Sequence, residues 1–150
     1  MQLSYKKQQA PAFVGQLDGS GPYNARSYAA EARISIGAAV RLGTNPEDQV
    51  LPATSGAGVI GFSIREQSVT QKADGFIGYD IGDSLAVVTV GRLWVETEDA
   101  VTAGNVANLV LSSGKLTDAA VGVGVETLSQ ISVRFVSSTT AAGLALVEVK

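Results

Sequence analysis

The stretch from residue 85 to residue 98, LAVVTVGRLWVETE, constrains the fold of this chain more than any other segment. Its odd positions are mostly apolar throughout, whereas its even positions change from apolar to polar at Gly91. A strand with two apolar faces is buried on both sides, and an alternating strand has one face in water. We therefore expect one long strand that bends or bulges out of the core at Gly91.

Shorter runs of alternating or apolar residues predict further strands. They lie at residues 32–36, 38–42, 59–69, 76–81, 106–111, 131–136 and 144–149. Turn signals separate them, such as Asn45-Pro46 and the hairpin-type sequence SSGK. No window favours a helix beyond a single turn at 27–32 with Ser27 as its cap. Strands at this spacing are typical of an all-β sandwich or barrel, so we expect one small β-barrel or sandwich domain in residues 31–150.

Residues 1–30 differ from the rest of the chain. They are rich in Gly, Pro, Asn, Ser and Gln, and their apolar residues follow no sustained period. A frayed terminus is one interpretation. The large side chains of Phe13, Leu17, Tyr23 and Tyr28 favour instead an extended N-terminal arm that packs along its own barrel or reaches a neighbour. These four residues are candidates for contact with a partner.

Several classes of function are excluded by composition. The chain has no cysteine and no histidine, which excludes the usual zinc sites, thiol nucleophiles and Ser-His-acid triads within one chain. Its net charge of −3 comes without a basic stripe, so we expect no nucleic-acid partner. No apolar run approaches the length of a membrane span, and the N-terminus lacks the apolar region of a signal peptide. We expect no enzyme, no cofactor and no membrane partner.

Two motifs suggest chemistry at first sight. GAGVIG at 56–61 matches the dinucleotide-binding pattern, but a loop precedes it and a strand-like sequence follows, where the motif needs a strand and then a helix. The acids Asp80, Asp83, Glu96, Glu98 and Asp99 contain the oxygen ligands that a divalent cation prefers, but no calcium-loop pattern. We interpret them as solvated surface acids with local charge pairing, and we expect no catalytic or metal site.

The polar face of the long strand carries Arg92 and Trp94 together with Glu96 and Glu98. A large aromatic on a wet face needs a cover, and interfaces are enriched in Trp, Tyr and Arg. Arg92 and Trp94 are therefore further candidates for partner contact. Two alternatives remain for what covers Trp94: the arm or loops of its own chain, or a partner subunit.

The order of these segments resembles a known family. The relevant stretches are APAFVGQLDGSGPYNARSY, then IGAAVRLGTNPEDQVLPAT, VIGFSIRE, IGDSLAVVTVGRLWVETEDAVTAGNVANLVLSSGKL and the closing AAGLALVEVK. Together they cover nearly the whole chain, and they resemble the structural cement, or head decoration, proteins of tailed bacteriophages.

The resemblance implies a structural virion protein that binds the outer surface of a bacteriophage capsid and clamps neighbouring major capsid subunits. It also implies a homo-oligomer, a dimer or a trimer, made in the host cytoplasm. The alternative is a carbohydrate- or cell-surface-binding β-module of a phage tail fibre or adhesin. Such modules usually expose several aromatics, and aromatics make up 6% of this chain.

Overall fold

The computed structural model describes residues 12–19, 21–66, 69 and 71–150, and these contain thirteen strands and no helix. The strands are β1 (Leu17–Asp18), β2 (Asn24–Ala30), β3 (Ile34–Ser35), β4 (Ala39–Leu42), β5 (Gln49–Pro52), β6 (Val59–Ser63), β7 (Gly78–Tyr79), β8 (Ser84–Glu96), β9 (Asn108–Val110), β10 (Leu116–Thr117), β11 (Val125–Thr127), β12 (Val133–Phe135) and β13 (Leu144–Val149). The all-β prediction is confirmed. No described segment forms a helix that could cross a membrane.

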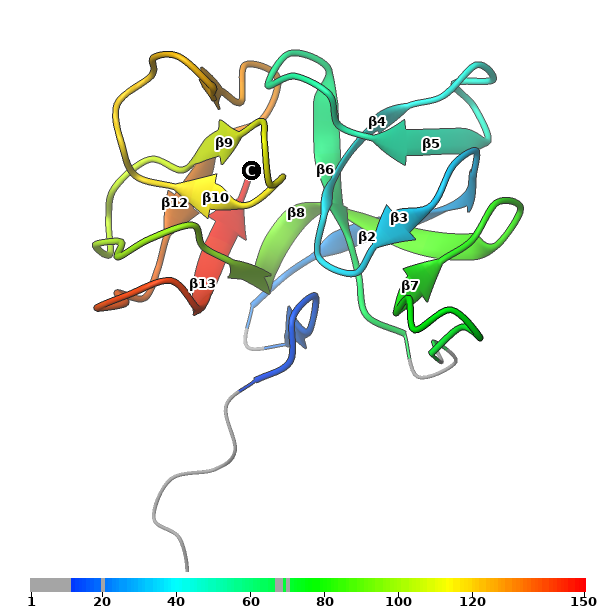
Figure 1. The fold of residues 1–150 in the computed structure, drawn as a ribbon, viewed down its shortest axis with the longest axis horizontal. Coiled ribbons are helices and arrows are strands. Elements are labelled where there is room, and N and C mark those ends of the chain that lie inside the picture. Colours follow the sequence, from blue (N-terminus) through cyan, green and yellow to red (C-terminus); the bar gives the residue numbers. More distant parts are fainter. Residues whose placement is uncertain (1–11, 20, 67–68, 70) are drawn as a thin grey trace, which may run out of the picture.

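Five strands close into a β-barrel, in the order β8-β2-β5-β4-β6 and back to β8 (Figure 1). Four of the five contacts are antiparallel, and β2 runs parallel to β5. The seam is made where Phe62 of β6 pairs with Val88 of β8. The turn predicted at Asn45-Pro46 joins β4 to β5, which pair with each other in antiparallel fashion. Closure removes the free edges that an open sheet would expose.

The second half of the molecule is built on the far end of β8. There β13 pairs with β8, and β12 pairs with β13. A separate sheet in the order β10-β9-β11 faces these strands, as the left part of Figure 1 shows. Its β9–β10 hairpin turns at residues 111–115, where the sequence SSGK predicted a turn.

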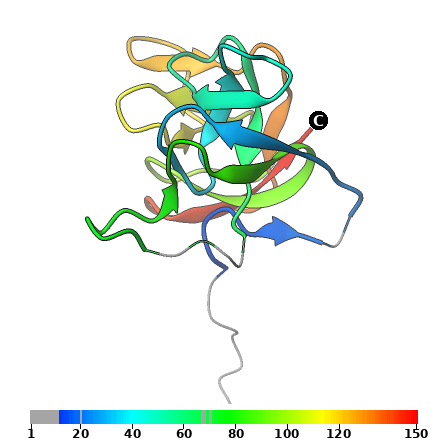
Figure 2. The ribbon, with the colours of Figure 1, turned by 90° about the vertical axis from the view of Figure 1, so that its right-hand side faces the viewer.

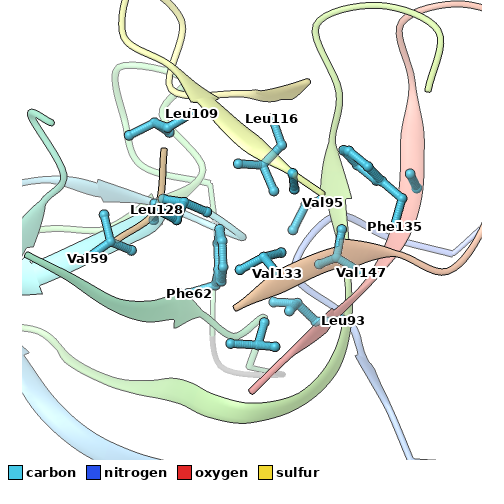
Figure 3. Close-up of a cluster of buried hydrophobic side chains, with 14 of the residues drawn as sticks. Val59, Phe62, Leu93, Val95, Leu109, Leu116, Leu128, Val133, Phe135 and Val147 are labelled. Carbon is cyan, nitrogen blue, oxygen red and sulfur yellow. The ribbon is translucent and has the colours of Figure 1, made fainter. Parts of the chain in front are cut away.

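Two clusters of buried side chains fill these two halves. One lies inside the barrel and includes Tyr28, Val40, Val50, Leu85 and Val87. The other lies between the barrel seam and the second half. Its largest fully buried members include Phe62, Leu93, Leu109, Leu116 and Phe135 (Figure 3). Strand β8 contributes to both clusters, so it joins the halves.

The predicted break in the long strand is confirmed. The pairing of β8 with β2 shifts register between Val88 and Val90, and Gly91 follows with φ of +140°. The extra residue changes which parity faces which side. Before the bulge, odd-numbered Leu85 and Val87 point into the barrel; after it, odd-numbered Leu93 and Val95 point into the other cluster. The odd-numbered apolar residues, which look like one continuous face in the sequence, therefore pack into two different cores.

The N-terminal region packs along its own barrel in the part that the structure describes. Residues 24–30 are β2, a barrel strand bonded to both β8 and β5, so the barrel begins before the expected boundary at residue 31. The single helical turn that residues 27–32 could have formed is not present, because β2 extends through residue 30. Residues 1–11 of the expected arm lie outside the described residues.

Candidate partner-binding surface

Residues 12–18, here called the N-terminal strap, run along one edge of β8. The amide N of Gly15 donates to the Trp94 carbonyl at 2.7 Å, and the amide N of Trp94 donates to the Gln16 carbonyl at 3.0 Å. Leu17 then pairs with Leu93. Strand β13 pairs with residues 91–96 of β8 as well, so this end of β8 has hydrogen-bonded neighbours from two other segments. The backbone beneath Trp94 is therefore fixed by the fold.

The strap is also fixed to the barrel. The Gly15 carbonyl accepts a hydrogen bond from the amide N of Arg65 at 2.8 Å. Gly15 has φ of +74°. A Cβ on Gly37 would lie 2.9 Å from the amide N of Gly15, so the two backbones are in contact with no side chain between them. In Figure 2 the strap and β1, in blue, lie at the lower side of the molecule. The strap therefore connects the end of β6 to the far half of β8.

Phe13 is the aromatic that the strap presents. Its side chain is 61% exposed, and the guanidinium carbon of Arg65 lies 4.9 Å from its ring centroid. The amide N of Phe13 donates to the Gln16 Oε1 at 3.0 Å. A cation over an aromatic face is attracted by the ring quadrupole, so Arg65 helps to hold the exposed ring in place.

Arg92 and Trp94 lie on the outer face of β8, as their parity predicted. Both are half-buried, and Trp94 is directly opposite Leu146 of β13. Arg92 Nη2 lies 3.2 Å from Glu148 Oε2, and Lys150 Nζ lies 3.1 Å from Glu148 Oε1. The hydrogen bond from Lys150, aided by the charge of Arg92, lowers the pKa of the Glu148 carboxyl. Trp94 is thus flanked by its own chain and still partly open to solvent.

Tyr23 lies beside the bulge of β8 and is 56% exposed. A Cβ on Gly91 would lie 2.7 Å from the Tyr23 Cβ, so only a glycine allows this close approach. A shallow cavity of about 230 Å³ adjoins it, lined by residues that include Pro22, Val90, Arg92 and Glu148. The exposed tyrosine, the bulge and the ion pair are therefore neighbours.

The other two candidates in this region are placed differently. Leu17 is half-buried and packs against the core between the two halves. Tyr28 is only 8% exposed and belongs to the cluster inside the barrel, with the Arg26 guanidinium 5.1 Å from its ring centroid. A partner could not reach most of the Tyr28 side chain, so we do not keep it as a contact residue. We call Phe13, Tyr23, Arg92 and Trp94 the β8 surface.

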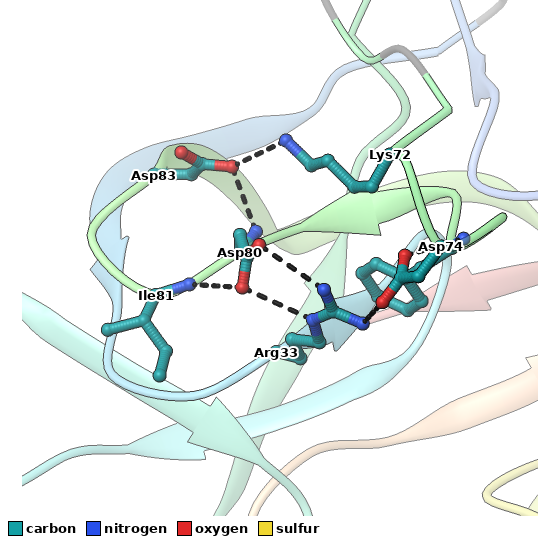
Figure 4. Close-up of polar contacts among 7 residues, drawn as sticks. Arg33, Lys72, Asp74, Asp80, Ile81 and Asp83 are labelled. Atoms are coloured by element: carbon teal, nitrogen blue, oxygen red, sulfur yellow. Dashed lines mark hydrogen bonds and ion pairs between the residues drawn. The ribbon is translucent and has the colours of Figure 1, made fainter.

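The acids that suggested a chemical site form ion pairs and hydrogen bonds that stabilise turns. Arg33 Nη1 lies 2.6 Å from Asp74 Oδ2, and Arg33 Nε lies 3.2 Å from Asp80 Oδ1 (Figure 4). Lys72 Nζ lies 3.1 Å from Asp83 Oδ2, which also accepts the amide N of Asp80 at 2.8 Å. The hydrogen bonds from Arg33 lower the pKa values of the Asp74 and Asp80 carboxyls.

The acids after β8 have similar roles. Glu98 accepts a hydrogen bond from the Ser113 hydroxyl at 2.6 Å, and Asp99 accepts one from the Thr117 hydroxyl at 2.9 Å. Glu96 and Glu98 are exposed while Thr97 between them is buried, as the parity predicted. Within the described part of the chain, no group of three or more acids could hold a metal ion.

Some neighbours of the β8 surface were not found from the sequence. Glu148, in β13, and Lys150, directly after it, alternate with buried Val147 and Val149, which indicates that both point away from the core. Their position beside Arg92 depends on the pairing of β13 with β8, and no local signal reports it. The same holds for Arg65, whose contact with Phe13 spans two distant segments.

Comparison with known proteins identifies the family. Residues 1–150 match a family model described as "Structural cement protein (E217 gp24/Pam3 gp6)". The chain belongs to this family. The resemblance inferred from the sequence is confirmed, and this cement protein has a structural role associated with the phage capsid.

Two solved structures are similar to this cement protein. A chain in the capsid of Myoviridae phage XM1 has a TM-score of 0.71 at 14% identity, over 99% of this chain and 96% of that chain. The head fibre gp8.5 N base of bacteriophage phi29 has a TM-score of 0.49 at 10% identity, over 86% of this chain and 95% of that one. At this level of identity the XM1 chain shows a shared fold. A search of curated proteins gave no match.

Proposed function

We propose that this cement protein binds the outer surface of a bacteriophage capsid and clamps neighbouring major capsid subunits. The observation that carries the proposal is the β8 surface, where Phe13, Tyr23, Arg92 and Trp94 lie along one strand and its strap. Aromatic and arginine side chains dominate the energetics of protein interfaces. Here the backbone that carries them is already ordered, which lowers the entropy lost on binding.

Side chains, rather than added strands, provide this binding. Two outer strands are covered on their far sides: the amide N of Gly104 donates to the Phe135 carbonyl of β12, and that of Glu98 donates to the Leu116 carbonyl of β10. A partner strand would have to displace these segments. The β8 surface instead offers the exposed ring of Tyr23 close to the ion pair of Arg92 and Glu148, and the exposed ring of Phe13 on the strap. Apolar contacts with a polar rim are typical of protein interfaces.

We also propose that the protein acts as a homo-oligomer, a dimer or a trimer, made in the host cytoplasm and added to the shell from outside. A symmetric shell repeats each contact many times, so an oligomer bound at several points gains affinity by avidity. The net charge of −3 is compatible with a position away from the packaged genome. Sedimentation equilibrium gives the solution mass, and a monomer at all concentrations would contradict the oligomer.

The test mixes the purified protein with undecorated shells of its major capsid protein. Bound protein is measured by co-sedimentation, and shell stability by the temperature of thermal disruption. We expect the wild type to bind and to raise that temperature. A Phe13→Ser/Tyr23→Ser variant should bind more weakly. Ile81→Ser changes another exposed apolar residue, in the turn between β7 and β8, and should bind like the wild type.

Two results would contradict the proposal. A wild type that does not bind shells would refute the capsid role on the outer surface, and binding to a glycan array instead would support the carbohydrate-binding alternative. Equal binding by the Phe13→Ser/Tyr23→Ser variant would refute the role of the β8 surface. Deletion of residues 1–30 is unsuitable for this test because it would remove barrel strand β2.

A further inference from the structure

The loop between β10 and β11 carries an exposed run without a single polar side chain. Residues 119–124, Ala-Ala-Val-Gly-Val-Gly, are all exposed, and we call them the apolar finger. Val121 is 58% exposed and Val123 is fully exposed. Single exposed apolar residues are normal on protein surfaces, but a contiguous run is costly in water and marks a site of interaction.

The apolar finger is held in shape by hydrogen bonds at its base. The side-chain amide of buried Asn108 donates to the Ala119 carbonyl at 2.8 Å. The amide N atoms of Gly122 and Val125 each donate to the other residue's carbonyl at 3.2 Å, and the amide N of Leu111 donates to the Gly124 carbonyl at 2.9 Å. A loop ordered before binding loses little entropy when it docks.

The two carboxylates next to the finger, Asp118 and Glu126, accept hydrogen bonds from other residues of this chain. Asp118 accepts hydrogen bonds from the amide N of Thr102 and the side chain of Asn105, both at 2.9 Å. Glu126 accepts the amide N of Gly56 at 2.6 Å. Loops that bind membranes combine apolar residues with basic residues that contact anionic lipids. Residues 118–126 contain no lysine and no arginine. The chemistry of the finger fits an apolar hollow in a protein.

The apolar area of the finger is too small to hold two copies of the chain together through the finger alone. Its two valines can bury on the order of 200 Å², whereas a stable interface buries about 800 Å² per partner. The finger therefore suits a protein that is already held elsewhere on the same assembly. It lies at the upper left in Figure 1, away from the strap at the lower side, so the two can meet different subunits.

We propose that the apolar finger inserts into an apolar hollow on a capsid subunit other than the one that meets the β8 surface. The inference rests on the proposed capsid binding and gives the clamp its second contact. Two contacts on one rigid molecule bind by avidity, so weakening one of them lowers the affinity of the whole molecule for an assembled shell.

The experiment measures the affinity of full-length variants for undecorated shells. Val121→Asp/Val123→Asp should bind about 10- to 100-fold more weakly than the wild type, since it would place two charges in an apolar contact. Val123→Leu should bind within about 3-fold of the wild type because it keeps the apolar contact. Ile81→Asp, which adds a charge at an exposed apolar residue of another loop, is the matched control and should also bind like the wild type. Urea unfolding should be nearly unchanged in all three, because the substituted side chains are exposed.

Each contrary result has a distinct meaning. If the wild type binds and the double aspartate variant binds equally well, the finger contact is refuted and the capsid role stands. If the wild type does not bind shells, the capsid role and the finger contact fail together. If the variant alters the sedimentation mass but not shell affinity, the finger joins copies of this chain. Flotation of the wild type, but not the variant, with phosphatidylglycerol vesicles would indicate a membrane contact instead.

Discussion

Replacement of Gly91 by alanine tests the bulge on which the two-core arrangement depends. The new Cβ would lie 2.7 Å from the Tyr23 Cβ and 3.3 Å from its Cα, and Gly91 has φ of +140°. The variant therefore combines two costs. A strained backbone at a non-glycine residue costs about 1–3 kcal/mol, and overpacking costs about 1–3 kcal/mol. We expect the free energy of unfolding to fall by about 2–6 kcal/mol in total.

Gly104→Ala separates the two costs. Gly104 also has a positive φ, of +91°, but a Cβ there would meet no atom within 4 Å. This variant should lose only the backbone contribution, about 1–3 kcal/mol. In a Tyr23→Gly background, where the clashing Cβ is absent, the cost of Gly91→Ala should fall to the same level.

The assay is equilibrium unfolding in urea, followed by circular dichroism and by the fluorescence of Trp94, the only tryptophan, three residues from the substitution. If Gly91→Ala and Gly104→Ala lower the free energy of unfolding equally, crowding against Tyr23 does not contribute to it and the reasoning is refuted. If the cost of Gly91→Ala is the same with tyrosine and with glycine at position 23, the close approach is not its cause.

Two further predictions concern the barrel and its charges. Gly61→Ala should lower the free energy of unfolding by about 3 kcal/mol or more, because the new Cβ would overlap the Val88 carbonyl oxygen at the β6–β8 seam; urea unfolding measures this, and an unchanged midpoint would contradict the close approach. The pKa values of Asp74 and Asp80 are lowered in the folded protein, so their stabilising contribution is present above the ordinary carboxyl pKa of about 4 and is lost as the pH falls below it. Urea unfolding at pH 7 and pH 3 should therefore show a smaller acid-induced loss in Arg33→Gln than in the wild type, and equal losses would argue against these ion pairs.

The candidate site was predictable only in part. The alternation around Leu93 and Val95 correctly placed Arg92 and Trp94 on the outer face, because side-chain direction in a strand follows parity. Tyr28 was misplaced because it lay in a segment without regular alternation, and its burial results from β2 joining the barrel between β8 and β5. Composition alone could not distinguish a barrel strand from an arm.

The sequence alone determined the all-β class, several of the turns and a break close to Gly91, because each depends on residues next to one another in the chain. It did not predict strands β1, β2, β5, β10 and β11. The tertiary structure decided which core each face of β8 enters, since one extra residue in the bulge exchanges the two faces. It also decided that β6 closes the barrel on β8, that Glu148 meets Arg92, and that residues 119–124 stay uncovered. These features depend on contacts between distant segments, and hydrophobic periodicity specifies which face of a strand is buried but not which strand will cover it.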